Sequence, residues 1–156
     1  MARSIAHKLR TAALMGPRRQ LLVVEACASM FIARMSLAIF PFSRLAKGFG
    51  AFVPPTDPRV LAQAEGAAEE QVRTARAIGW AVRSSAPYMP FKTVCLQQAM
   101  AAHAMLRRRG IASVMHFGAG KSDDKPIDAH AWLDAVGVKV TGYPVAANFS
   151  ELGCFV

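Results

Sequence analysis

Residues 90–110 constrain the fold of this 156-residue chain more than any other segment, because they carry signals for both ends of a helix. Pro90 precedes the helix, Thr93 is a residue type that caps helix N-termini, and Gly110 follows three arginines that suit a last turn. This pattern predicts a helix with Cys95 at its second position. There the free backbone N–H groups and the helix dipole favour thiolate over thiol, so Cys95 is a candidate nucleophile.

His130 lies 35 residues after Cys95, in the strand-like run Ala-His-Ala-Trp-Leu-Asp. A histidine beside a thiol can take its proton and later return it to a leaving amine. The pair therefore indicates acyl chemistry by a cysteine nucleophile, although a single cysteine in an apolar helix is more often a packing residue. His103 and His116 are competing bases, of which His103 lies about 12 Å from Cys95 along the same helix.

The pattern of helices and strands predicts an α+β fold. An apolar helical segment at 21–42 is followed by a loop at 48–58 and a helix from Pro58 to about residue 84, with breaks possible at Gly66 or Gly79. Downstream of the Cys95 helix, the pattern predicts a strand at 112–117, a polar loop at 118–128, and a hairpin with strands at 129–135 and 138–141. Helices first and strands afterwards predict a nucleophile helix packed on a small antiparallel sheet.

Composition predicts a basic N-terminal arm at residues 1–20 and a single domain at 21–156, with an N-terminal helical segment at 21–84. The three cysteines, Cys27, Cys95 and Cys154, are few and lack metal-type spacing. They predict neither a disulfide framework nor a metal site, and no cofactor motif is present. We therefore expect a cytoplasmic protein, because a nucleophilic thiol needs a reducing compartment.

The first 47 residues hold eight basic residues and one acid, Glu25, in a chain whose net charge is +9. This charge fits a solvated arm, or a surface that binds an anionic partner or a membrane. We expect no nucleic-acid binding, because no aromatic residues are interspersed among the early basic residues and no known binding motif is found. Glu25 and Arg34 interrupt the apolar segment at 21–42, which argues against an integral membrane span. We expect a buried or partner-facing helix, with Glu25 paired to an arginine.

Three sequence runs carry a resemblance to a known family. They are Thr-Val-Cys-Leu-Gln-Gln-Ala around Cys95, Leu-Arg-Arg-Arg-Gly-Ile at 106–111, and Ala-His-Ala-Trp-Leu-Asp around His130. Together they resemble the leader peptidases of lasso-peptide biosynthesis, which are small bacterial transglutaminase-like cysteine proteases of the microcin-processing B type. The resemblance extends from about Arg18 to Phe155 and implies a papain/transglutaminase-like fold.

The resemblance also implies a function and partners. The chain would remove the leader peptide from a ribosomally made precursor, with Cys95 and His130 as catalytic residues. Its partners would be the precursor peptide, a leader-recognition protein and an ATP-dependent macrolactam synthetase. Two alternatives stay open: a catalytically weakened scaffold that docks the maturation complex through its N-terminal helix, and a basic membrane- or nucleic-acid-associated module.

The third catalytic residue is not evident from the sequence. A three-residue hairpin connection would place position 142 opposite His130, where the family has its aspartate, but this position is Gly142. Asp134 lies about 13 Å from His130 along the same strand. Asn148, Asp128 or one of the loop acids (Asp123, Asp124) could orient the imidazole instead, or the enzyme could work with a dyad.

Overall fold

The computed structural model describes residues 16–122 and 125–156. The first part is helical: α2 (Pro17–Ile39), α3 (Phe42–Ala46), α4 (Pro58–Ala62), α5 (Glu69–Ser85), the 3-10 turn η1 (Ala86–Tyr88) and α6 (Cys95–Arg107), with the short strand β1 (Phe52–Val53) among them. Then follow the strands β2 (Val114–Ser122), β3 (Lys125–Ala135), β4 (Val138–Thr141) and β5 (Phe149–Phe155). The α+β prediction, with helices before the sheet, is confirmed.

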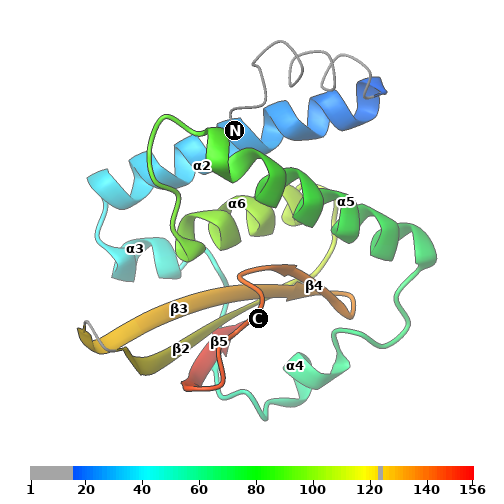
Figure 1. Cartoon of the computed structure of the whole chain (residues 1–156). Helices are drawn as coiled ribbons and strands as arrows, with labels where there is room; N and C mark the ends of the chain where they lie inside the picture. The colour runs from blue at the N-terminus through cyan, green and yellow to red at the C-terminus, as the bar shows by residue number, and fades with distance from the viewer. Residues whose placement is uncertain (1–15, 123–124) are drawn as a thin grey trace.

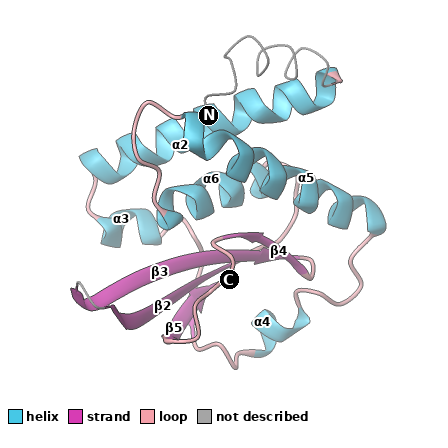
Figure 2. Cartoon of the chain, viewed as in Figure 1, coloured by secondary structure: helices cyan, strands magenta, loops and turns pink. Residues whose placement is uncertain are grey.

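The strands form one antiparallel sheet in the order β1-β5-β2-β3-β4. Helices α2, α5 and α6 lie on one side of the sheet and the short α4 lies on the other (Figure 1). Figure 2 shows the same division of the molecule into a helical layer and a strand layer. Helix α6 contacts both α2 and β3, so it lies in the middle of the molecule, between the outer helix and the sheet.

The main core lies between the sheet and the helical layer. Met115 of β2, Leu133 of β3 and Val140 of β4 are fully buried there, against Ala99 and Leu106 of α6. Burying a leucine of this kind stabilises the fold by about 1.5–3 kcal/mol. A smaller cluster of Val53, Val114 and Cys154 lies on the other face of the sheet.

Helix α2 buries only one narrow stripe, made of Ala26, Ser29, Met30 and Ala33. Its other side carries large apolar residues that solvent reaches, which are Leu21, Val24, Phe31, Ile32, Met35 and Ile39. By length and composition α2 could cross a membrane, although core helices of soluble proteins and signal sequences pass the same test. The helix starts at Pro17, inside the predicted arm, because proline suits the first helical position.

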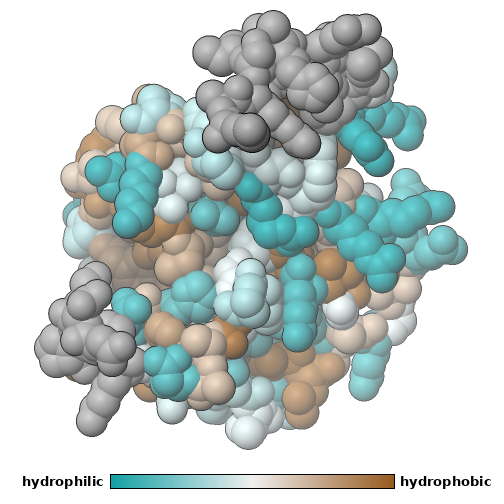
Figure 3. Space-filling model, viewed as in Figure 1, coloured by the Kyte–Doolittle hydropathy of each residue, from teal (hydrophilic) through white to brown (hydrophobic). Residues whose placement is uncertain are grey.

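Glu25 is paired as predicted. Its carboxylate lies 2.8 Å from Nη2 of Arg108 and 2.6 Å from Nη2 of Arg109. These ion pairs hold α2 against the C-terminal end of α6. In the face of the molecule shown in Figure 3, hydrophilic side chains gather over the exposed side of α5, while apolar residues follow the junction with the sheet.

Several predicted boundaries are corrected. The helix predicted from Pro58 is interrupted at Gly66, one of the two break positions expected: α4 ends at Ala62, α5 begins at Glu69, and Gly66 between them has φ +67°. The predicted loop 118–128 is mostly strand, since β2 runs to Ser122 and β3 begins at Lys125. The sequence pattern does not predict strands β1 and β5.

The predicted hairpin of β3 and β4 is present, but its turn is shorter than expected. Ala135 pairs with Val138, and both turn residues have positive φ, 47° for Val136 and 75° for Gly137, as a two-residue turn requires. A register shift follows at Leu133, which pairs with Thr141, the last residue of β4. His130 therefore has no partner residue in β4.

Candidate active site

Cys95 is the first residue of α6, and its side chain is half-buried. The N-cap is Val94 rather than the predicted Thr93. The side chain of Gln97 accepts a hydrogen bond from the backbone N–H of Val94 at 3.2 Å, and Thr93 instead donates to the carbonyl of Ala86 at 3.3 Å. Cys95 thus lies in the first turn, beside backbone N–H groups that have no acceptor within the helix.

Cys95 belongs to the side of α6 that packs on the sheet. Spacings of four, three and four residues place it on one stripe with Ala99, Ala102 and Leu106, all of them fully buried. Arg108, on the opposite side of the helix, binds Glu25 of α2. The stripe that begins with Cys95 therefore points away from α2 and toward the sheet.

His130 lies on the other face of that sheet. Strand alternation places it with Trp132, whose ring centroid is 5.9 Å from the His130 ring, whereas Leu133 points to the helices, as does Ala131, the partner of Phe117. The ring of Phe149 lies 5.5 Å away on the same face. Among the described residues no hydrogen bond joins Cys95 to His130, so the structure does not bring the predicted pair together.

The His130 imidazole is oriented by a backbone carbonyl. Its Nε2 lies 2.6 Å from the oxygen of Gly142. Because a carbonyl only accepts, Nε2 carries the hydrogen and Nδ1 is the basic nitrogen of the neutral ring. The predicted approach of position 142 to His130 is thus present, through the backbone rather than through a side chain.

Gly142 cannot be replaced by an acid without distortion. Its φ is +83°, and a Cβ at this position would lie 2.5 Å from the carbonyl oxygen of Ala131 and 2.7 Å from Cα of Trp132. Close approach of two backbones therefore explains why position 142 is glycine.

The structure places two of the other candidates for the orienting residue, Asp128 and Asn148, near the His130 end of the sheet. Asp128 is two positions before His130 on the same face, about 7 Å along β3. Asn148 directly precedes Phe149 at the start of β5 and has interactions of its own. Asp123 and Asp124 lie outside the described residues.

The competing histidines have other partners. Nδ1 of His103 lies 2.9 Å from the Ser113 hydroxyl, and burial, with the charge of Arg107, lowers the pKa of this ring. His116 lies between two carboxylates, with Nδ1 2.5 Å from Glu151 and Nε2 3.4 Å from Asp134. Burial would lower the pKa of His116, but hydrogen bonds to both acids outweigh it and raise the value.

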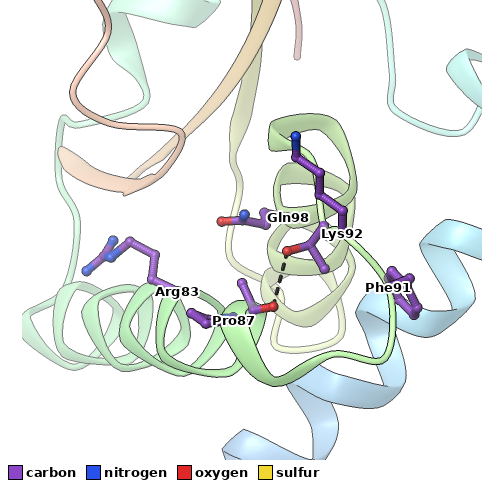
Figure 4. A pocket seen from close by; sticks show the side chains of 7 residues that line it. Arg83, Pro87, Phe91, Lys92 and Gln98 are labelled. Carbon is purple, nitrogen blue, oxygen red and sulfur yellow. Dashed lines mark hydrogen bonds between the residues drawn. The ribbon is translucent and has the colours of Figure 1, made fainter. Parts of the chain in front are cut away.

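A pocket of about 470 Å³ opens beside the start of α6. Its lining residues are Arg83, Ala86, Pro87, Phe91, Lys92, Thr93 and Gln98. Figure 4 shows Gln98 on α6 and Phe91 close to α2, whose Phe31 ring lies 6.3 Å from the Phe91 ring. The lining includes two cations and no acid, so the pocket favours carbonyl or carboxylate groups.

Comparisons with known proteins agree with this fold. A family model described as the transglutaminase-like superfamily matches residues 36–153, which include α6, the hairpin and most of β5. Searches of curated proteins and of solved structures found no match. Since the family model covers about three quarters of the sequence and the helix-on-sheet arrangement fits it, the chain belongs to the transglutaminase-like superfamily.

Proposed function

We propose that this chain is a cysteine peptidase that removes the leader from a ribosomally made lasso-peptide precursor. The observation that carries the proposal is the half-buried Cys95 in the first turn of the central helix of a transglutaminase-like domain. The first turn of a helix places backbone N–H donors and the positive end of the helix dipole beside such a thiol. The resemblance around Cys95 and His130 supplies the substrate class.

In the proposed reaction, the Cys95 thiolate attacks the scissile carbonyl, the peptide C–N bond breaks and the leader is held as an acyl-enzyme; water then hydrolyses this thioester, which releases the leader and restores the thiol. The unpaired N–H groups of the first turn of α6 stabilise the oxyanion. His130, held through Nε2 by Gly142, accepts the thiol proton at Nδ1 and returns it to the leaving amine. A carbonyl stabilises the imidazolium less than a carboxylate would, so we expect slow turnover compared with a full triad.

The proposal requires the two side chains to meet. Within the described residues His130 lies on the face of β3 that is turned away from α6. We therefore expect cleavage to depend on the precursor and the leader-recognition protein, which would have to shift β3 or the 142–148 segment.

The pocket beside α6 is the proposed binding site for the leader segment next to the cleaved bond. Arg83 and Lys92 supply positive charge, and the Gln98 amide supplies N–H donors that suit peptide carbonyls and acidic side chains. As further proposals, the macrolactam synthetase acts on the product of this reaction, and the protein works in the cytoplasm.

A second candidate function is a scaffold of the maturation complex without catalytic activity. The separation of His130 from Cys95 by the sheet favours it, as does the lack of an acid at Gly142. The exposed apolar side of α2 would then be the docking surface. The two functions differ in whether the native chain cleaves at all.

A single-turnover assay with precursor peptide, with and without the leader-recognition protein, separates the two. If the chain is a peptidase, Cys95→Ser lowers cleavage by about 10⁴-fold or more, and Cys27→Ser, a change of the same kind on α2, leaves the rate unchanged. Cleavage that survives in Cys95→Ser excludes the peptidase proposal as stated. If the native chain forms the complex and never cleaves, the scaffold function is correct.

A further inference from the structure

Three potential metal ligands meet on the face of the sheet that is turned away from α6. The side chains of His116, Glu151 and Cys154 each offer a donor atom, and these atoms all lie within 4.8 Å of one another. His116 and Cys154 are paired residues of β2 and β5. These residues are distinct from Cys95 and from the pocket beside it.

A β-bulge brings Glu151 to the same face as Cys154. Residues three apart on a regular strand point to opposite faces. The register between β2 and β5 shifts at this point, because Phe117 pairs with Gly153 and the next residue, Gly118, pairs with Glu151. Leu152 therefore has no partner in β2, and its side chain is 65% exposed. Bulges of this kind re-aim side chains and are frequent next to functional sites.

The His116 ring is held in one orientation. It is 94% buried and stacks on Trp132, with an interplanar angle of 0° and centroids 5.5 Å apart. Nδ1 points to Glu151 at 2.5 Å, while Nε2 is buried without a hydrogen-bond partner and lies 3.4 Å from a carboxylate oxygen of Asp134. Asp134 in turn accepts a hydrogen bond from the Tyr143 hydroxyl at 2.6 Å.

This arrangement matches the environment of a metal-binding histidine. Such a histidine binds the ion through one ring nitrogen and turns the other toward a carboxylate that is itself hydrogen-bonded. Here Nδ1 is on the side of Glu151, and Nε2 faces Asp134. The Cys154 thiol has only weak contacts, at 3.7 Å and 4.0 Å, with the carbonyls of Val53 and Pro54.

We propose that His116, Glu151 and Cys154 form a binding site for a transition-metal dication, with Zn²⁺ as the best fit. A thiolate, an imidazole and a carboxylate are the donor types that zinc prefers, and three protein ligands leave a fourth position open. Mg²⁺ and Ca²⁺ fit this donor set poorly because they take oxygen donors. The Glu151 side chain, 28% exposed, provides the route from solvent.

Binding would deprotonate the Cys154 thiol, because the thiolate is the form that coordinates Zn²⁺, and the released proton would pass to solvent. The metal would join β5 to β2 beside the smaller apolar cluster.

The test uses the full chain, stripped with a chelator and then titrated with Zn²⁺ alone. We expect one zinc per chain by elemental analysis, a higher melting temperature, and, with Co²⁺ as probe, a thiolate charge-transfer band. Cys154→Ser and Glu151→Gln should each weaken binding by about 10-fold to 100-fold or more. Cys27→Ser is the matched control and should bind as the native chain does.

Glu151→Gln keeps the experiment decisive if Cys154→Ser fails to fold, because Glu151 is partly exposed. Zinc binding that is unchanged in Glu151→Gln, or a native chain that takes up no zinc, would overturn the proposal. In the second case His116 serves only as a structural partner of Asp134 and Glu151. Neither result depends on Cys95, so the outcome is independent of the peptidase proposal.

Discussion

The two faces of the sheet have different chemistry although the same strands make both. The face toward α6 is apolar, with Met115, Leu133 and Val140 in the main core. The opposite face gathers ionisable and aromatic side chains, which are His116, His130, Trp132, Asp134, Tyr143, Glu151 and Cys154. The nucleophile candidate Cys95 is on the first side and the histidines of the strands are on the second.

This difference shows that a cysteine at a helix start and a histidine in a strand do not by themselves make a catalytic site. A strand changes face at every residue, so His130 and Ala131 point in opposite directions. A one-residue change of register would exchange the two faces. The predictions below test whether the division between the faces is as firm as the packing indicates.

The largest effect is expected at Gly142, where the chain that follows β4 passes close to β3. Gly142→Asp should destabilise the fold by about 3 kcal/mol or more, since it adds backbone strain to overpacking. The added Cβ would lie 2.5 Å from the Ala131 oxygen at a φ of +83°. Urea denaturation measures the loss. A Gly142→Asp variant that folds normally and cleaves faster would mean that this face opens easily enough to form a triad.

Gly110→Asp is the matched control for this variant. Gly110 also has a positive φ, +66°, but a Cβ there would meet nothing within 4 Å. Its loss of stability, about 1 kcal/mol, therefore measures backbone strain alone. The difference between the two variants is the effect of the close approach at Gly142. Equal losses would show that the approach is not tight.

Local signals explain which parts of the fold were predicted. Gly110 ends α6, and Val136-Gly137 makes the hairpin turn. Strand β5 was missed because its bulge breaks the alternation of polar and apolar residues. Its strand character comes from pairing with β1 and β2, far away in sequence.

Glycines misled the prediction of the loop at 118–128. Gly118 lies against the Trp132 ring and Gly120 against the backbone of Asn148, so both serve close packing within the sheet rather than a turn. The sequence also does not predict on which face of the sheet His130 lies. Ala131 and Trp132 are both buried, so the pattern of apolar residues does not show which face packs against the helix. The prediction of Glu25 succeeded because a carboxylate beside apolar residues needs a cation.

An intermediate effect is expected when the ion pairs between α2 and the C-terminal end of α6 are weakened. Glu25→Gln removes the charge that holds Arg108 and Arg109. Because both arginines are partly exposed, we expect a loss of about 1–2 kcal/mol. Thermal or urea denaturation gives the value. Glu69→Gln, at an exposed pair with Arg73, is the control and should change stability by less than about 0.5 kcal/mol.

The same contact predicts a pH dependence. Hydrogen bonds from Arg109 lower the pKa of Glu25, against the effect of burial, and Arg108 adds to the shift. The stabilisation is therefore complete above the ordinary glutamate value of 4.5 and is lost as the pH falls below it, through the lowered pKa. The native chain should lose more stability between about pH 5 and pH 3 than Glu25→Gln. Parallel curves for the two chains would contradict this role of Glu25.

The smallest effect is expected on the outer side of α2, which is apolar like the helix face of the sheet but has no covering layer among the described residues. Val24 and Ile32 are 65% and 62% exposed, so Val24→Gln combined with Ile32→Gln should change stability by no more than about 0.5 kcal/mol. Met30→Ala on the buried stripe should instead cost about 2–5 kcal/mol. Urea denaturation of both variants makes the comparison. A large loss in the double glutamine variant would mean that this side is buried in solution by another copy of the chain, because solvent-facing side chains cannot carry such a free energy.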